Sequence, residues 1–157
     1  MNSLEVIYMT SAIELAKYVV EYYHKNNSNI TNLKLQKVMY YIQGYTLKVL
    51  GVVAFEEDIY HWSYGPVIVE VYYQFNQFRS DPIVSEPPKS KLPLKLKKVV
   101  DFVLSECFEY SAFTLVKKTH EEDPWKNTNT NGVMTVQAIR SYFKNNDPLM
   151  IGDKIEQ

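Results

Sequence analysis

The chain has 157 residues, of which 46% are hydrophobic and 22% charged, and its formal net charge at pH 7 is −1. This length suits a single domain with one closed core, and this composition excludes a disordered chain. The small net charge gives no general attraction to nucleic acid or to an anionic membrane, so we expect neither as a direct partner.

Three local features narrow the class of protein further. The single cysteine, Cys107, excludes an internal disulfide and a cysteine-based zinc cage. The N-terminal stretch MNSLEVIYMTS lacks the basic start and long apolar run of a secretory signal. No stretch reaches the roughly 18 uninterrupted apolar residues of a membrane-spanning helix, so the sequence predicts a cytoplasmic protein.

Two helices open the chain. Residues 11–14 fit a capping box, and apolar residues then recur at helical spacing to about Lys25. Thr31 or Asn32 caps the second helix, because both side chains can accept a hydrogen bond from an N-terminal amide. Gly51 stands where a C-terminal glycine stops a helix.

The middle of the chain is predicted to contain a short strand, a third helix and a surface connection. Residues 52–62 are rich in β-branched and aromatic side chains and predict a turn and one short strand. Pro66 suits the first position of a third helix, where its missing N–H costs nothing. Residues 81–93 hold four prolines, so they form a surface connection, and Pro93 opens a fourth helix.

The last third of the chain is predicted to add two helices. Ser111 caps a fifth helix to about Thr119, residues 124–132 form a loop, and Thr135 caps the last helix. From Lys144 onward the chain is polar and is expected to fray. The sum is one mainly α-helical domain of about six helices, with a small β element before the third.

The sequence WSYGPV at residues 62–67 allows two interpretations. In the first, the Gly-Pro step makes a tight turn into a helix, and Trp62 packs beneath this structural corner. In the second, His61, Trp62 and Tyr64 form a recognition rim, because Trp and Tyr dominate interface hot spots.

No set of residues has the spacing of a catalytic or metal site. The three histidines lie far apart and the five glycines are scattered singly, so no metal motif, phosphate loop or nucleophile elbow is present. Cys107 lies on the apolar face of the predicted fourth helix and is expected in the core. The acidic pairs at residues 56–57 and 121–122 are expected in solvated turns. We therefore expect no enzyme, no cofactor and no metal.

Lysine and tyrosine are unevenly distributed. Five lysines lie between residues 89 and 98, which fits a solvated face and also a partner contact.

Tyrosine doublets at residues 22–23, 40–41 and 72–73 fall in three predicted helices. Neighbouring helical residues point about 100° apart, so one tyrosine of each pair can face the core and the other its edge. Such tyrosines suit a protein-binding surface as well as boundary packing.

Two long motifs resemble those of a known family. Residues 35–44, LQKVMYYIQG, resemble the Leu-Gln-Lys-Leu-Leu-Tyr-Tyr-x-Gln-Gly signature of the Panacea domain of SocA-like antitoxins and phage-associated GepA-like proteins. Residues 58–67, DIYHWSYGPV, are similar to its second signature, an acidic turn followed by Trp-x-x-Gly-Pro-Val. Residues 119–120 and 124–125 resemble its Thr-His and Pro-Trp steps. The resemblance runs from about residue 10 to residue 143.

The resemblance implies a domain layout and a set of structural positions. We expect an N-terminal extension over residues 1–9, the Panacea-like helical domain over residues 10–143, and a polar tail over residues 144–157. The positions that match the signatures are Leu35, Gln36, Lys37, Tyr40, Tyr41, Gln43, Trp62, Gly65, Pro66, Val67, His120, Pro124 and Trp125.

The resemblance also implies a function in protein binding rather than catalysis. The expected activity is that of an antitoxin that neutralises a cognate toxin by direct binding. A protease adaptor for the toxin and a phage or prophage accessory protein that binds a host factor are the alternatives. The family does not identify the partner, and a homodimer stays open. Trp62 is expected to support the corner from inside, and the candidate partner-binding residues are His61, Tyr64, Tyr22 and Tyr73.

Overall fold

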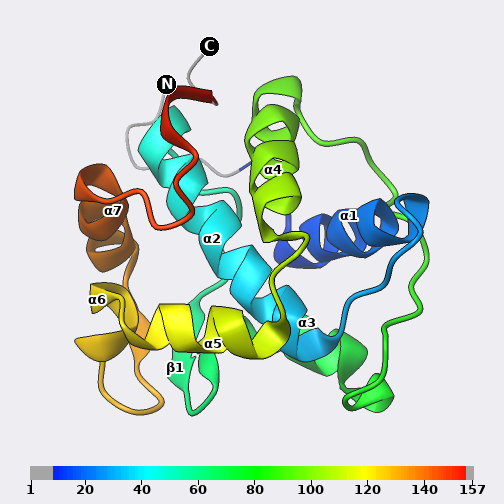
Figure 1. Ribbon diagram of the computed structural model, residues 1–157, viewed down its shortest axis with the longest axis horizontal. Coiled ribbons are helices and arrows are strands. Elements are labelled where there is room, and N and C mark those ends of the chain that lie inside the picture. Colours follow the sequence, from blue (N-terminus) through cyan, green and yellow to red (C-terminus); the bar gives the residue numbers. More distant parts are fainter. Residues whose placement is uncertain (1–8, 155–157) are drawn as a thin grey trace.

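Helix α2 (Asn32–Leu50) runs through the centre of the molecule, and the other helices pack around it (Figure 1). The computed structural model describes residues 9–154, so residues 1–8 of the predicted extension over residues 1–9 lie outside them. The surrounding helices are α1 (Ala12–Lys25), α3 (Val69–Phe75), α4 (Leu94–Cys107), α5 (Ala112–His120), α6 (Asp123–Lys126) and α7 (Val136–Asn145). Two short 3-10 helices are η1 (Asn76–Phe78) and η2 (Gly152–Lys154).

The predicted class, a mainly helical domain with a small β element, is confirmed. The described residues contain one helix more than expected, because Asp123–Lys126 forms the short helix α6 within the predicted loop. Proline is tolerated in its first turn, where the missing N–H would have no helical partner. Among these residues, no helix is both long enough and apolar enough to span a membrane.

The predicted helix ends are largely confirmed, because they depend on local chemistry. Thr31 accepts a hydrogen bond from the amide of Lys34, and Gly51 ends α2 with φ of 74°. Ser11 caps α1, but the second half of its capping box is absent. The Glu14 carboxylate instead accepts hydrogen bonds from backbone amides of residues 89–90, and so fixes the proline-rich connection to α1.

Helix α2 is buried on nearly every side. Its apolar residues meet α4, α5 and α7, and Gly44 lets Phe143 of α7 approach closely, since an added Cβ would lie 2.3 Å from the ring. A helix covered all round cannot leave its polar side chains in water. Its glutamines, lysines and tyrosines therefore bind acceptors or donors on neighbouring segments.

The small sheet has three antiparallel strands in the order β2 (Gly65–Val67), β1 (Ile59–Trp62) and β3 (Val133–Met134). Pro66 pairs with His61 in this sheet, so the prediction that Pro66 begins the third helix is wrong; α3 begins at Val69. An edge strand tolerates proline, because the missing N–H leaves no ladder bond unmade there. Strand β3 was missed, since two residues carry no detectable alternation.

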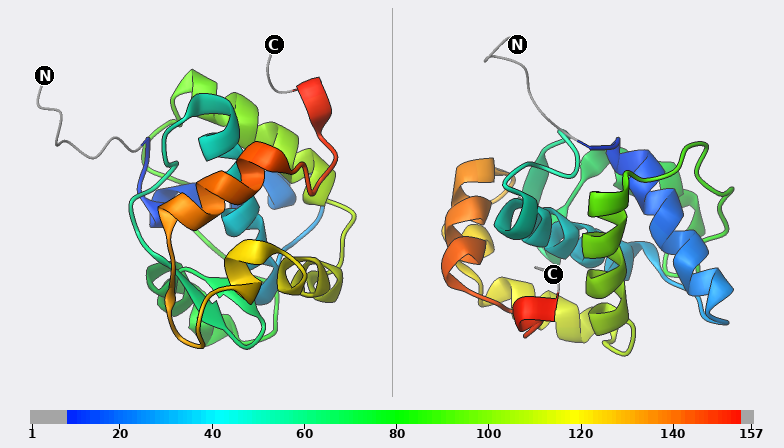
Figure 2. Two further views of the ribbon diagram at one scale, coloured as in Figure 1. Left: turned by 90° about the vertical axis from the view of Figure 1, so that its left-hand side faces the viewer. Right: turned by 90° about the horizontal axis from the view of Figure 1, so that it is seen from above.

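The prediction of a frayed tail from Lys144 is wrong for the segment that follows α7. This segment turns back across the molecule toward α2 and α4 (Figures 1 and 2). Leu149 and Ile151 are buried, and the hydroxyl of Tyr45 in α2 donates to Asp147 at 2.5 Å. Burial alone would raise the pKa of Asp147, but hydrogen bonds from Tyr45 and two backbone amides lower it overall.

Candidate partner-binding site

Three stacked rings fasten the β1–β2 hairpin to α5 and α6. The indole of Trp125 lies between the imidazoles of His61 and His120, with centroid distances of 3.9 and 4.0 Å. Its Nε1–H donates to the carbonyl oxygen of Trp62 at 3.1 Å. Nδ1 of His61 lies 2.8 Å from the carbonyl oxygen of Trp125, a contact that requires the proton on Nδ1. The Thr-His and Pro-Trp steps therefore build the support of the hairpin.

His61 and Trp62 differ from their predicted positions, because His61 is the more buried of the two. His61 is buried in the ring stack, whereas Trp62 is only half-buried and its ring lies 5.1 Å from that of Tyr72. The predictions that Trp62 is the inner support and that His61 lies on the rim are therefore wrong. Tyr64, at the tip of the hairpin, is 64% exposed, as a rim residue would be.

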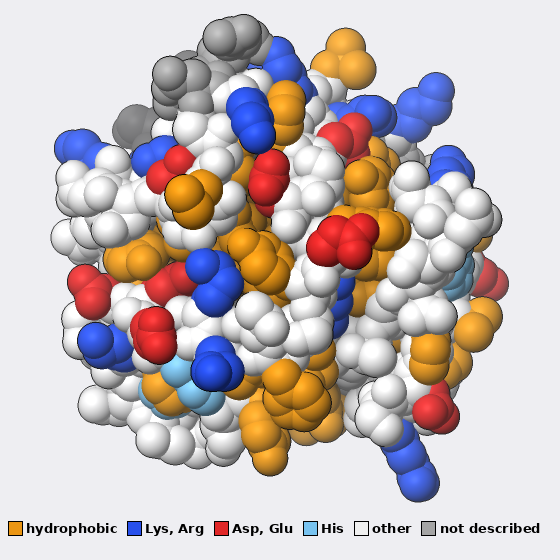
Figure 3. Space-filling view, viewed as in Figure 1, with side chains coloured by type: hydrophobic (Ala, Val, Ile, Leu, Met, Phe, Trp, Pro, Cys, Tyr) orange, Lys and Arg blue, Asp and Glu red, His pale blue; other side chains and the backbone are white. Residues whose placement is uncertain are grey.

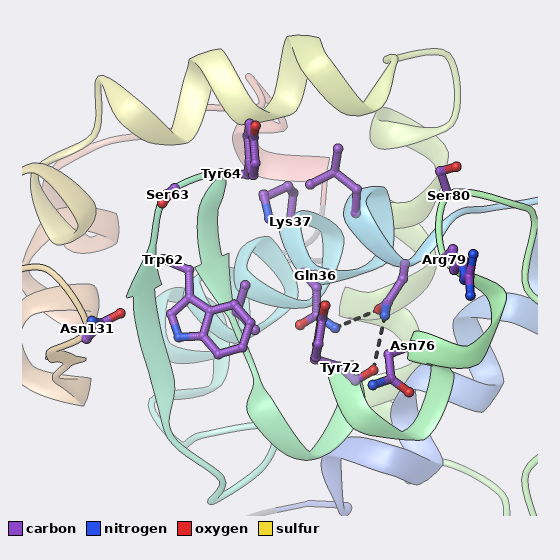
Figure 4. A pocket seen from close by; sticks show the side chains of 13 residues that line it. Gln36, Lys37, Trp62, Ser63, Tyr64, Tyr72, Asn76, Arg79, Ser80 and Asn131 are labelled. Atoms are coloured by element: carbon purple, nitrogen blue, oxygen red, sulfur yellow. Dashed lines mark hydrogen bonds between the residues drawn. The ribbon is translucent and has the colours of Figure 1, made fainter.

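A cavity of about 550 Å³ opens between the hairpin, the first turns of α2, and α3 with η1 (Figure 4). Trp62, Tyr64 and Tyr72 form its aromatic side, and Gln36 and Lys37 form its inner wall. The remaining lining residues are Asn32, Leu33, Ser63, Val67, Asn76, Arg79, Ser80 and Asn131. This volume lies within the range of ordinary ligand pockets, and the cavity is open on one side.

A chain of amide hydrogen bonds holds the inner wall in place. Gln36 Nε2 donates to Asn32 Oδ1 at 2.9 Å, and Asn32 Nδ2 donates to the carbonyl oxygen of Tyr72 at 3.1 Å (Figure 4). Gln36 Oε1 accepts the amide of Ile68 at 2.8 Å. Gln36 of the first signature thereby joins α2 to Ile68, just before α3, and through Asn32 to Tyr72 within α3.

Lys37 is fully buried beside the cavity. Its Nζ donates to the carbonyl oxygen of Pro66 at 3.2 Å, and burial lowers the pKa of this amine to about 7. Gly65 has φ of 109° and packs against the lysine chain, since an added Cβ would lie 2.7 Å from Lys37 Cε. Residues with a Cβ rarely adopt this φ, and the close approach of the lysine is a second reason for glycine there.

Glu122 is the main buried group that sequence reasoning missed. It was expected in a solvated acidic turn, but its side chain is buried and accepts hydrogen bonds from Tyr40 at 2.9 Å and Tyr41 at 2.7 Å. Burial raises its pKa to about 7, although the two hydroxyls act in the opposite direction. Both tyrosines of this doublet therefore face inward, and Glu122 ties the start of α6 to the first signature in α2.

Most of the remaining predicted residues are buried, and two tyrosines lie nearer the surface. Leu35, Pro124 and Cys107 are buried core residues, which confirms the core prediction for Cys107, and burial raises the pKa of its thiol to about 12. Gln43 joins α2 to residues 54–55 through three hydrogen bonds. Among the possible rim tyrosines, Tyr73 and Tyr22 are placed differently.

Tyr73 is 62% exposed, and its ring lies 5.3 Å from that of Tyr72 at the cavity. Tyr22 is half-buried, does not line the cavity, and packs against Tyr23 and Phe108. On the face shown in Figure 3, apolar side chains are spread among acidic and basic ones. No metal-binding cluster of His, Cys, Asp or Glu occurs in the described part of the chain.

The fold is a small helical domain, and its buried polar contacts hold in place the inner wall of an aromatic-sided cavity. The family model described as "Antitoxin SocA-like, Panacea domain" matches residues 35–126. This match covers more than half of the chain and includes the hairpin, the ring stack and the inner wall of the cavity. The chain therefore belongs to the SocA-like antitoxin family with a Panacea domain. Searches of curated proteins and of solved structures gave no match.

Proposed function

We propose that this protein is an antitoxin that neutralises a cognate toxin by binding it directly. The observation that carries the proposal is the aromatic wall of the cavity, in a chain of the SocA-like antitoxin family. Trp62 and Tyr72 are half-buried there, and Tyr64 and Tyr73 stand largely in solvent. We call these four residues the aromatic rim. Large amphipathic rings of this kind are the common anchors of protein interfaces.

The contrast between buried signature residues and exposed tyrosines supports this choice of surface. The buried signature residues are occupied by contacts inside the molecule, such as those of Gln36, Gln43 and Trp125. The rim tyrosines Tyr64 and Tyr73 have most of their area free for a partner. His61 and Tyr22 do not belong to this surface, because His61 is buried and Tyr22 packs against Tyr23 and Phe108.

The chemistry of the cavity favours binding over catalysis. Its titratable lining residues are Lys37, Arg79, Tyr64 and Tyr72, with no Asp, Glu, His or Cys among the described lining residues. General acid–base or nucleophilic catalysis needs a pair of matched groups within hydrogen-bond reach. The cavity offers hydrogen-bond donors and aromatic area, which suit recognition.

Growth rescue followed by co-purification tests the proposal. The gene adjacent to this one is induced in a bacterial host, alone and with this protein, and the surviving culture is used for pull-down. Rescue with a stable complex is the expected result. Rescue without a complex, and with toxin levels that fall only when a protease is present, would identify an adaptor instead. A harmless neighbour would favour an accessory protein that binds a host factor.

A matched pair of variants places the binding surface. Tyr64→Ala with Tyr73→Ala removes two exposed rings of the aromatic rim, and we expect a loss of about tenfold to a hundredfold in affinity. Leu94→Ala is the control, because Leu94 is 84% exposed but does not line the cavity. Equal affinities for both variants would place the toxin elsewhere.

A further inference from the structure

The cavity carries positive charge without a balancing carboxylate. Lys37 and Arg79 line it, and none of its described lining residues is an Asp or Glu. This bias is local, because the whole chain has 18 acidic and 17 basic residues. The first turn of α2, at Asn32 and Leu33, also lines the cavity and brings the positive end of the helix dipole to it.

Lys37 has more hydrogen-bonding capacity than the fold uses. An ammonium group has three N–H donors, and Pro66 is the acceptor that the described residues supply. No ion pair joins Lys37 to any carboxylate in the described part of the chain. Burial disfavours the charged form of Lys37 and lowers its pKa to about 7, so a negative charge entering the cavity would favour the protonated amine and be stabilised by it.

Arg79 is held at the cavity by an unusual backbone conformation. Its φ of 53° and ψ of −121° lie where L-residues are rarely found, at the end of η1. Figure 4 places its side chain near Asn76 and Ser80, across the cavity from Trp62. Arg79 is exposed and makes no ion pair with a described carboxylate, so its guanidinium is available to a ligand.

We propose that the cavity binds an acidic side chain, Asp or Glu, of the toxin. Arg79 forms the charge-assisted hydrogen bonds to the carboxylate, and Lys37 adds positive potential from the inner wall. Trp62, Tyr72 and Leu33 cover the methylene groups of the same side chain. This inference rests on the proposed function, because it names the chemistry that the toxin presents to the aromatic rim.

A protein carboxylate fits this cavity better than a phosphate does. Apolar and aromatic residues lie next to the two cations, and they suit the aliphatic stem of Asp or Glu. The exposed rings of Tyr64 and Tyr73 extend the contact surface beyond the cavity, as a protein partner requires.

The test measures the dissociation constant of the purified complex with the toxin at low and high NaCl concentrations. We expect Arg79→Gln to weaken binding at least tenfold at low salt and to flatten the salt dependence. Lys37→Met is expected to act in the same direction. Arg140→Gln is the matched control, because Arg140 is also exposed but lies on α7 outside the cavity, and its affinity should stay within twofold of wild type.

Reciprocal changes on the toxin identify the carboxylate. Each Asp is changed to Asn and each Glu to Gln, one at a time. One such change should weaken the wild-type complex tenfold or more and have no further effect on the Arg79→Gln complex.

Three outcomes would overturn the inference while the proposed function stands. In the first, the toxin binds the wild type, but its dissociation constant for Arg79→Gln is within twofold of the wild-type value. In the second, no single Asp or Glu change on the toxin weakens the wild-type complex without further weakening the Arg79→Gln complex. In the third, a free nucleotide displaces the toxin, and no toxin carboxylate matters, which would make phosphate the occupant. Failure of the wild type to bind any toxin would instead refute the proposed function itself.

Discussion

Lys37 in the central helix donates to the carbonyl oxygen of Pro66 in strand β2, at 3.2 Å across 29 positions of the chain. This contact joins the two signature motifs, because Lys37 belongs to the first and Pro66 to the second. It also places an amine next to the cavity that Trp62, Tyr64 and Tyr72 line. One buried hydrogen bond thus connects the scaffold of the family to its candidate binding site.

Burial of Lys37 predicts a gain of stability at alkaline pH. Its folded pKa, about 7, lies below the unfolded value of 10.5, so the unfolded chain binds the proton more tightly between these values. The free energy of unfolding therefore rises with pH across this window, by up to about 4 kcal/mol between pH 7 and 10. Urea titrations should show this rise in the wild type relative to Lys37→Met. Parallel pH profiles for the two proteins would contradict the burial of a titrating amine.

Glu122 predicts the opposite slope at acidic pH. Its folded pKa, about 7, lies above the unfolded value of 4.5, so the folded state holds the proton more tightly. Stability is highest below pH 4.5 and falls as the pH rises to 7, by about 3 kcal/mol relative to Glu122→Gln. The two profiles are compared by thermal unfolding from pH 4 to 8. A difference that does not change with pH would show that Glu122 is solvated.

The ring stack predicts that Trp125 contributes more to stability than Trp62. Trp125→Phe removes the Nε1–H that the carbonyl oxygen of Trp62 accepts and reduces stacking on two imidazoles. We expect a loss of about 2 kcal/mol in the free energy of unfolding, measured in urea. Trp62→Phe, at the half-buried cavity wall, should cost less than half of this. The reverse order would mean that the hairpin is anchored through Trp62.

The contact between Gly44 and Phe143 predicts a size-dependent coupling. An added Cβ at Gly44 would lie 2.3 Å from the Phe143 ring, so Gly44→Ala should destabilise the protein by about 1–3 kcal/mol. Phe143→Leu makes room, and the double variant should therefore lose less stability than the sum of the single variants. Strict additivity would show that the two residues do not meet.

The backbone of Arg79 predicts that stability and binding can be separated. Arg79→Gly places the one residue without a Cβ at φ of 53°, and we expect stability equal to wild type or higher by about 1 kcal/mol. Binding of the toxin should weaken at the same time, because the guanidinium is lost. Thermal unfolding and titration calorimetry of one protein sample measure both quantities. A variant that unfolds more easily would show that Arg79 serves the fold.

Local patterns predicted the helices well but not the contacts between them. Caps such as Thr31 and Gly51 act within a few residues and can be recognised in the sequence. Glu122 could not be placed, because its partners, Tyr40 and Tyr41, are more than 80 positions away. The buried tail segment was missed for a related reason, since Leu149 and Ile151 form too short an apolar pattern.

The two misplaced residues of strand β1, His61 and Trp62, could have been predicted correctly. Side chains alternate along a strand, so with Ile59 inside, His61 must also point inward and Trp62 outward. The expectation that Trp62 lies inside came from its place in the family signature, which does not take this alternation into account. Pro66 misled for a different reason, because a helix start and an edge strand both accept proline.

The indole signals of the two tryptophans give the most direct test of the central claim, that the toxin is bound at the aromatic rim. Trp62 lines the cavity, whereas Trp125 lies in the ring stack. The measurement is an NMR spectrum of the backbone amides and indole N–H groups of the ¹⁵N-labelled protein. Addition of the purified toxin should shift or broaden the Trp62 indole signal together with the backbone amides of Tyr64 and Tyr73. A complex that forms while these signals stay unchanged would contradict the account.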